Sequence, residues 1–64
     1  MEDTFKERLK KEFDDLLDKK SKLEVFINSR NINNIPQIQK SLLIVQLDAM
    51  TTYATCLNER LDNL

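Results

Sequence analysis

The sequence contains no glycine and no histidine, and only one proline and one cysteine among its 64 residues. Without glycine, the tight turns of β-hairpins are difficult to form, so this composition favours helices over a sheet. Cys56 is the single cysteine, which excludes an intrachain disulfide and, in the absence of histidine, a zinc site. A chain this short buries only roughly 60% of its unfolded surface. Self-association is the remaining means of completing its core.

Familiar catalytic patterns are missing as well. We find no glycine-rich phosphate loop, no nucleophile elbow and no metal-ligand cluster in the sequence. The acidic residues alternate with lysines, as on a solvated helix face, and Cys56 lies on an apolar stripe that suits a structural thiol. We therefore expect a protein that is not an enzyme and that needs no cofactor or metal.

The charges are balanced, with Lys+Arg 10, Asp+Glu 11 and a formal net charge of -1. A duplex nucleic-acid binder needs a clustered excess of Lys and Arg, so we expect no such partner. No apolar run approaches the roughly 18 to 20 residues of a membrane span. The acidic start Met1-Glu2-Asp3 lacks the layout of a signal peptide. We expect a soluble protein of the cytoplasm without membrane contact.

Two helices are predicted, at about residues 4–29 and 35–62, with a loop at about 30–35. Thr4 and Glu7 have the spacing of a capping box at the start of the first helix. The apolar residues of this helix recur in steps of three, four and seven, as in an amphipathic helix. On its polar face, acid-then-base pairs are expected at Glu7/Lys11, Asp15/Lys19 and Asp18/Lys22.

The loop is rich in asparagine, which tolerates the left-handed conformation that ends many helices. Pro36 fits the first turn of the second helix, and Ile32 and Ile35 are expected to pack back onto the hairpin. A linker this short makes the two helices antiparallel neighbours. The predicted fold is all-α, a two-helix hairpin that assembles into an oligomeric helical bundle.

The second helix carries two apolar stripes with heptad spacing. The first stripe is predicted at an interface between subunits, and its residues are Leu43, Leu47, Met50, Ala54, Leu57 and Leu61. The second stripe consists of Ile38, Leu42, Val45, Ala49, Thr52 and Cys56. A surface helix in a monomer needs one apolar stripe, so two stripes indicate two partners. One partner is the first helix and the other is a second copy or another protein; the spacing leaves open which stripe serves which, and the number of subunits.

A polar row runs beside these stripes, because Gln39, Gln46, Tyr53 and Arg60 are seven residues apart. Tyr53 could stack on a base and Arg60 could bind a phosphate through a two-pronged contact. The alternative is ordinary: Tyr53 fills an interface edge with its hydroxyl in water, and Arg60 forms a salt bridge.

Basic residues of the first helix are further candidates for anion binding, among them Arg8 and Lys11. Each lies in a cluster that acidic residues dilute. A two-fold interface brings two copies of one residue together. A basic residue that looks isolated in the sequence could therefore be half of a phosphate clamp.

Three runs, which together cover nearly the whole chain, resemble a family of short phage proteins first catalogued in crAss-like phages. They are Phe5-x-Glu7-Arg8-Leu9-x-x-Glu12, Leu16-x-x-Lys19-x-x-x-Leu23-x-x-Phe26-Ile27-x-Ser29 and Leu42-Leu43-x-x-Gln46-Leu47-x-Ala49-Met50-x-x-Tyr53-x-x-x-Leu57-x-x-Arg60, of which the stretch from Gln46 to Tyr53 is the most distinctive. That family is similar to the helical-hairpin sponges with which phages counter CBASS and Thoeris immunity. The resemblance implies a symmetric oligomer that sequesters a cyclic oligonucleotide or an ADP-ribose-derived messenger without cleaving it. Two alternatives stay open: a module that binds a host or phage protein through an apolar stripe, and a structural coiled coil without a ligand.

Overall fold

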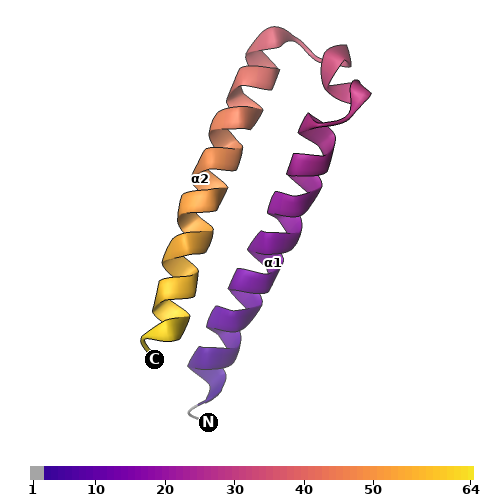
Figure 1. The fold of residues 1–64 in the computed structure, drawn as a ribbon. Coiled ribbons are helices and arrows are strands. Elements are labelled where there is room, and N and C mark those ends of the chain that lie inside the picture. Colours follow the sequence, from indigo (N-terminus) through magenta and orange to yellow (C-terminus); the bar gives the residue numbers. More distant parts are fainter. Residues whose placement is uncertain (1–2) are drawn as a thin grey trace.

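The computed structural model describes residues 3–64 and contains two long helices in this range. Helix α1 spans Asp3–Ile27, a 3-10 helix η1 spans Arg30–Asn34, and helix α2 spans Gln37–Asp62. The two long helices lie antiparallel, so the C-terminus lies beside the start of α1 (Figure 1). The described residues include no strand. The predicted helical hairpin is confirmed, while a single chain leaves its assembly as a prediction.

Helix α1 ends two residues earlier than predicted, and side-chain hydrogen bonds cap it in place of a left-handed backbone residue. No described residue has a positive φ, so the expected left-handed asparagine is wrong. Instead, the side-chain amide of Asn28 donates to the carbonyl oxygen of Glu24 at 2.9 Å. The hydroxyl of Ser29 donates to the carbonyl oxygen of Phe26 at 2.7 Å. The same two carbonyl oxygens also accept the backbone amides of Asn28 and Ser29, each at 3.1 Å, so the side chains add a second donor to carbonyls in the last turn.

A similar hydrogen bond forms at the end of α2, where the side-chain amide of Asn63 donates to the carbonyl oxygen of Glu59 at 2.7 Å. At the other end of the molecule, α1 is already helical at Asp3. Thr4 therefore lies inside the first turn, whereas the predicted capping box requires it immediately before the first helical residue. The residue before Asp3 is outside the described part of the chain.

The connection between the helices is itself ordered as η1. Ile32 and Ile35 are half-buried there, as predicted, and η1 packs against α1. Pro36 is extended, with φ -58° and ψ 150°. Its carbonyl oxygen accepts hydrogen bonds from the backbone amides of Gln39 and Lys40, at 3.0 and 3.2 Å. Pro36 therefore immediately precedes α2 instead of lying in its first turn, and α2 begins two residues later than predicted.

The core is a seam between α1 and α2. Its buried members are Leu9, Leu16, Ala54 and Leu57, and Phe13, Met50 and Leu61 pack against them. Leu57 is the most deeply buried, with 1% of its surface exposed. Fully burying one leucine side chain stabilises a fold by roughly 1.5–3 kcal/mol. Few side chains therefore hold the two helices together.

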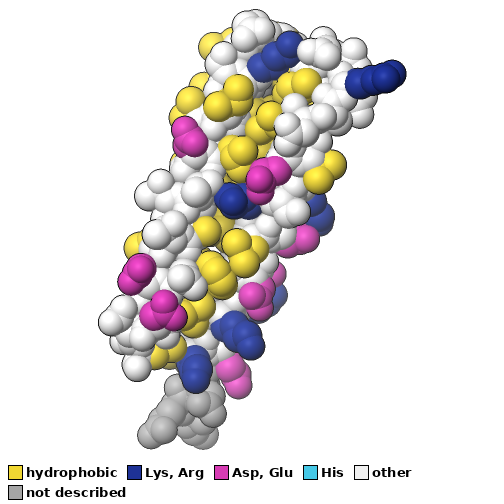
Figure 2. All heavy atoms as spheres, viewed as in Figure 1, with side chains coloured by type: hydrophobic (Ala, Val, Ile, Leu, Met, Phe, Trp, Pro, Cys, Tyr) yellow, Lys and Arg dark blue, Asp and Glu magenta, His cyan; other side chains and the backbone are white. Residues whose placement is uncertain are grey.

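The hairpin is long and thin. Its extents are 47 × 15 × 13 Å and its radius of gyration is 14.8 Å, against about 11 Å for a compact domain of this length. Its accessible surface of 5179 Å² exceeds the roughly 4,300 Å² expected of a compact monomer of this mass. On the face drawn in Figure 2, apolar side chains gather along the line where α1 and α2 meet. One chain thus leaves more surface exposed than a globular fold would.

The charged surface pairs differ partly from those predicted. Lys22 bonds Asp18 at 3.0 Å, as expected. Lys11 bonds Asp15 at 3.2 Å, so the predicted Glu7/Lys11 and Asp15/Lys19 pairs give way to a base-then-acid pair. Exposed pairs of this kind contribute only about 0.3–0.5 kcal/mol each. The seam therefore contributes more to the stability of the hairpin than these surface pairs do.

Leu57→Asp should abolish the helical fold, because it places a carboxylate in the most buried position of the seam, at a cost of several kcal/mol. Circular dichroism should show loss of most helical signal at neutral pH. The matched control is Asn58→Asp, which adds the same carboxylate to an exposed neighbour and should leave helicity unchanged. A Leu57→Asp protein that sediments as a helical monomer would contradict this account of the core.

Candidate ligand-binding site

The first stripe of α2 faces α1 within one chain. Ala54 and Leu57 are buried, Met50 and Leu61 pack against them, and Leu43 and Leu47 are half-buried. The six residues predicted at an interface between subunits are thus used inside the hairpin. The reason is that α1 is covalently tied beside α2 and covers the stripe first. The question that the sequence left open, which stripe contacts α1, is thereby answered for the chain.

The second stripe remains on the outside of α2. All six of its residues are exposed. Its largest side chains are also among the most exposed apolar groups, since Ile38 is 63% and Val45 62% exposed. Ile44 is exposed as well, although it belongs to neither stripe. Continuous apolar surface of this kind marks an interaction site more often than an inert surface.

The polar row lies along the edge of the second stripe. Gln46 directly follows Val45, and Tyr53 directly follows Thr52, so each is turned one helical step from that stripe. Gln46, Tyr53 and Arg60 are all exposed, and the ring of Tyr53 is 45% exposed. Within residues 3–64 their side chains make no hydrogen bond or ion pair. The salt bridge of the ordinary alternative for Arg60 is therefore not formed in this range.

The structure brings the two candidate basic residues of α1 to the end of the hairpin that holds Arg60. Leu9, next to Arg8, shares one cluster with Leu57. The first half of α1, to which Arg8 and Lys11 belong, lies beside the last half of α2 (Figure 1). Arg8 is exposed, whereas the ammonium of Lys11 bonds Asp15. Gln46 lies farther along α2, about 10 Å from Tyr53 at seven residues of helical rise.

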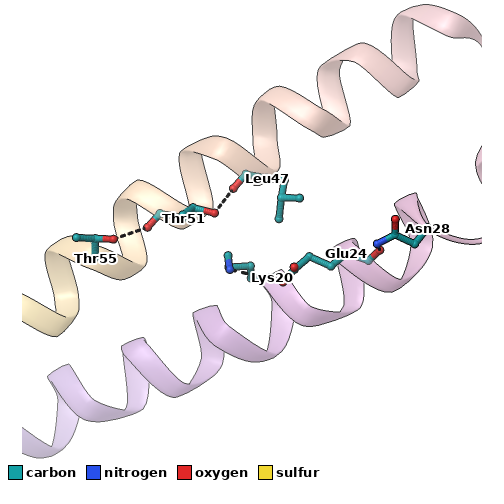
Figure 3. Close-up of polar contacts among 6 residues, drawn as sticks. All are labelled: Lys20, Glu24, Asn28, Leu47, Thr51 and Thr55. Atoms are coloured by element: carbon teal, nitrogen blue, oxygen red, sulfur yellow. Dashed lines mark hydrogen bonds and ion pairs between the residues drawn. The ribbon is translucent and has the colours of Figure 1, made fainter.

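On another side of α2, two threonine hydroxyls donate hydrogen bonds to carbonyl oxygens of the same helix (Figure 3). Thr51 donates to the carbonyl oxygen of Leu47 at 2.9 Å, and Thr55 donates to that of Thr51 at 3.0 Å. Such bonds to the preceding turn satisfy the hydroxyl locally. These threonines offer a ligand less than the polar row does.

Lys20 is a residue that sequence reasoning overlooked. It falls four residues after Leu16 and three before Leu23, which places it on the core face of α1. Its side chain is 24% exposed and bonds Glu24 at 3.5 Å. Figure 3 shows Lys20 extending from α1 into the space between the helices, into which Leu47 of α2 also extends. The spacing was the available signal, but Lys20 sits in a run of lysines that reads as a solvated face.

Lys20→Met should stabilise the hairpin, because it keeps an unbranched chain in the seam and removes a partly desolvated ammonium. A gain of about 1 kcal/mol corresponds to a rise of roughly 4–8 °C in melting temperature for a domain of this size. Lys19→Met, at the exposed neighbouring position, is the control and should change little. Equal shifts for both variants would show that the position of Lys20 between the helices has no energetic consequence.

The part of the chain that the structure describes encloses no pocket and groups no set of potential metal ligands. Cys56 is a free, exposed thiol. Among residues 3–64, neither helix combines the length and the apolar character that crossing a bilayer requires.

Comparison with known proteins identifies the relatives of this hairpin. Residues 3–63, almost the whole chain, match the model of a family described as Sequestin. The chain belongs to the Sequestin family. It is also 32% identical over 57 residues to a relative in Enterobacteria phage T4, with 89% of each chain covered. That relative is described as an uncharacterized 7.5 kDa protein in the denB-rIIB intergenic region.

These matches bear out the expected likeness to small phage proteins. The name of the Sequestin family also points to sequestration. No solved structure matches this Sequestin chain.

Proposed function

We propose that this Sequestin is an anti-defence sponge, which binds a cyclic nucleotide immune messenger in the host cytoplasm and sequesters it without cleavage. The observation that carries the proposal is that residues 3–63 match the Sequestin family, and the name of that family points to sequestration. The relative in phage T4 supports a role in phage infection. The polar row beside an exposed apolar stripe supplies groups suited to a nucleotide.

Each residue of the row has a chemical role in this proposal. The exposed ring of Tyr53 stacks on a base, which is worth about 1–3 kcal/mol for a base on an aromatic side chain. The guanidinium of Arg60 binds a phosphate through two parallel hydrogen bonds. The amide of Gln46 both donates and accepts, as the edge of a base requires. None of these contacts activates water or a nucleophile, so the messenger is held and not cut.

Assembly completes the site in this proposal. The protein is a homo-oligomer that covers the second stripe, and a symmetric interface presents two copies of every binding residue. Arg8 and Lys11 then add positive charge from two chains at the ends of the bundle, near Arg60. The formal net charge doubles as well, from -1 on one chain to -2 on a dimer, so the attraction of an anionic ligand depends on the local grouping of these basic side chains and not on the net charge.

Tyr53→Ala and Arg60→Ala should each abolish ligand binding while the assembly persists, because both side chains are exposed and outside the core. The assay is thermal unfolding with cyclic di- and trinucleotides and cyclic ADP-ribose isomers. For the parent protein, a ligand at 100 times its dissociation constant adds about 2.7 kcal/mol. This moves the melting temperature of so small a domain by several degrees.

The matched control is Arg30→Ala, which removes an exposed arginine in η1 at the opposite end of the hairpin. It should retain the shift. Normal binding by both Tyr53→Ala and Arg60→Ala would remove the proposed site. A flat response of the parent protein to every messenger class would remove the sponge itself. Mass spectrometry of the recovered ligand tests the second half of the proposal, since hydrolysis products would show an enzyme.

A second candidate function is a protein-interaction module, which the exposed second stripe favours. An amphipathic helix of a host or phage protein could lie along Ile38, Leu42 and Val45, as in helix-in-groove recognition. One partner should then copurify in stoichiometric amount and be lost from a Leu42→Asp variant. A single well-defined homo-oligomer without such a partner would count against this function.

A further inference from the structure

Side-chain size changes in one direction along the second stripe. The N-terminal half carries the bulky residues Ile38, Leu42 and Val45. The C-terminal half carries the small residues Ala49, Thr52 and Cys56. All six are exposed and none is charged. Their spacing of four, three, four, three and four residues reads the same in both directions, so the stripe can face an inverted copy of itself.

We propose that the second stripe packs against the second stripe of another copy in antiparallel orientation. The two-fold axis passes through this contact at the level of residue 47 along α2. The pairing of the stripes stands without any ligand. Its consequence for the polar row, set out below, rests on the function proposed above. The occupant of the exposed face of α2 is thus a second copy of this chain.

Antiparallel pairing puts a bulky residue against a small one in every layer. Ile38 meets Cys56 of the second copy, Leu42 meets Thr52, and Val45 meets Ala49. The volumes of these layers differ less from one another than those of parallel pairing would, which favours even packing along the two helices. Parallel pairing would instead stack Ile38 on Ile38 and Cys56 on Cys56, so one end would be crowded and the other hollow.

The hairpin has the surface for such a dimer. It exposes more area than a compact monomer of its mass, and the excess includes Ile38 and Val45, each more than 60% exposed. The stripe from Ile38 to Cys56 is about 27 Å long at 1.5 Å per residue. An antiparallel two-fold contact uses this same patch from both chains and therefore closes on itself without forming filaments.

The same axis unites the polar rows of the two chains. Rotation about a two-fold axis perpendicular to both helices keeps each row on the same face of the dimer. Gln46 then lies beside Gln46 of the second copy, and Tyr53 lies beside Gln39 of that copy. Parallel pairing would separate the rows onto opposite faces. By helical rise, the two copies of Gln46 lie near the axis, whereas the two copies of Tyr53 lie about 18 Å apart along the dimer and those of Arg60 about 39 Å apart. Each Tyr53–Arg60 pair would therefore form a site of its own, so the dimer would present two identical sites on one face.

The opposite edge of the interface carries a small electrostatic cost. Asp48 lies two residues from Gln46 and on the other side of the stripe, so the axis places it across from Asp48 of the second copy. Both carboxylates are exposed, and water and salt screen their repulsion. The antiparallel arrangement therefore predicts a dimer that tightens when this charge is removed.

The test uses the native Cys56 as a cross-linking probe. In the Ile38→Cys variant, mild oxidation should give a closed dimer joined by two disulfides between Cys56 and the introduced thiol. Those two positions are about 27 Å apart within one helix, so no bond can form inside a chain. The parent protein should not cross-link, because its two Cys56 thiols are also about 27 Å apart in the antiparallel dimer.

Two controls keep the outcome clear. Ile38→Cys with Cys56→Ser should not cross-link, since it leaves one thiol at each end. Leu42→Cys with Thr52→Cys and Cys56→Ser places a second layer under test and should again give a doubly bonded dimer. Asp48→Asn should lower the dissociation constant of the dimer at low salt, measured by sedimentation equilibrium. All variants alter exposed positions, and circular dichroism checks that each is folded.

A Cys56–Cys56 dimer of the parent protein would overturn the antiparallel arrangement in favour of a parallel one. A ladder of disulfide-linked species would show a head-to-tail contact, and absence of cross-links in both layers would show that another surface assembles. These outcomes are distinct from failure of the sponge. A closed dimer that binds no messenger would support the antiparallel interface and contradict the sponge function. A protein that binds a messenger but does not cross-link would support the sponge function and contradict the interface.

Discussion

The contact between α1 and the first stripe of α2 is the interaction on which the rest of the molecule depends. Four buried side chains within the described residues form the seam, and Leu57 is the most deeply buried of them. Ordering each residue of a chain costs about 1–2 kcal/mol of backbone entropy, so two long helices joined by so little burial are close to the limit of stability. Every other surface takes its orientation from this seam, because it fixes how α2 is rotated about its axis.

That rotation leaves α2 with an unusual outer face. A helix with one apolar stripe would hide it against α1 and present polar groups to water. Here the second stripe stays exposed, and the polar row with Tyr53 and Arg60 runs along its edge. The groups suited to a nucleotide and the surface suited to another copy are therefore neighbours on one helix. In the proposed function, assembly and ligand binding would be coupled by this geometry, since whatever covers the stripe also shapes the surroundings of the row.

Membership of the Sequestin family agrees with such a design. A sequestering protein needs affinity and copy number, and it needs no catalytic group. A hairpin of 64 residues is too small to enclose a nucleotide in its own core. By lining a shared site with identical residues from several chains, a small protein can surround a ligand with more groups than one chain provides. Within the hairpin, the partly buried Lys20 places a charge at a position where an apolar side chain would be more stable.

The sequence by itself determined the helical hairpin and the two stripes of α2, because periodicity depends only on helical geometry. It also marked Gln46, Tyr53 and Arg60 as one row. It did not determine how α1 ends, since Asn28 and Ser29 could cap through their side chains or through a left-handed backbone, and both read alike in sequence. The spacing of Lys20 put it on the core face of α1, but its place in a run of lysines hid that signal. The sequence could not choose which stripe α1 covers. Two stripes of equal spacing are equivalent until the rotation of α2 against α1 is fixed by packing, and only the tertiary structure decides that rotation.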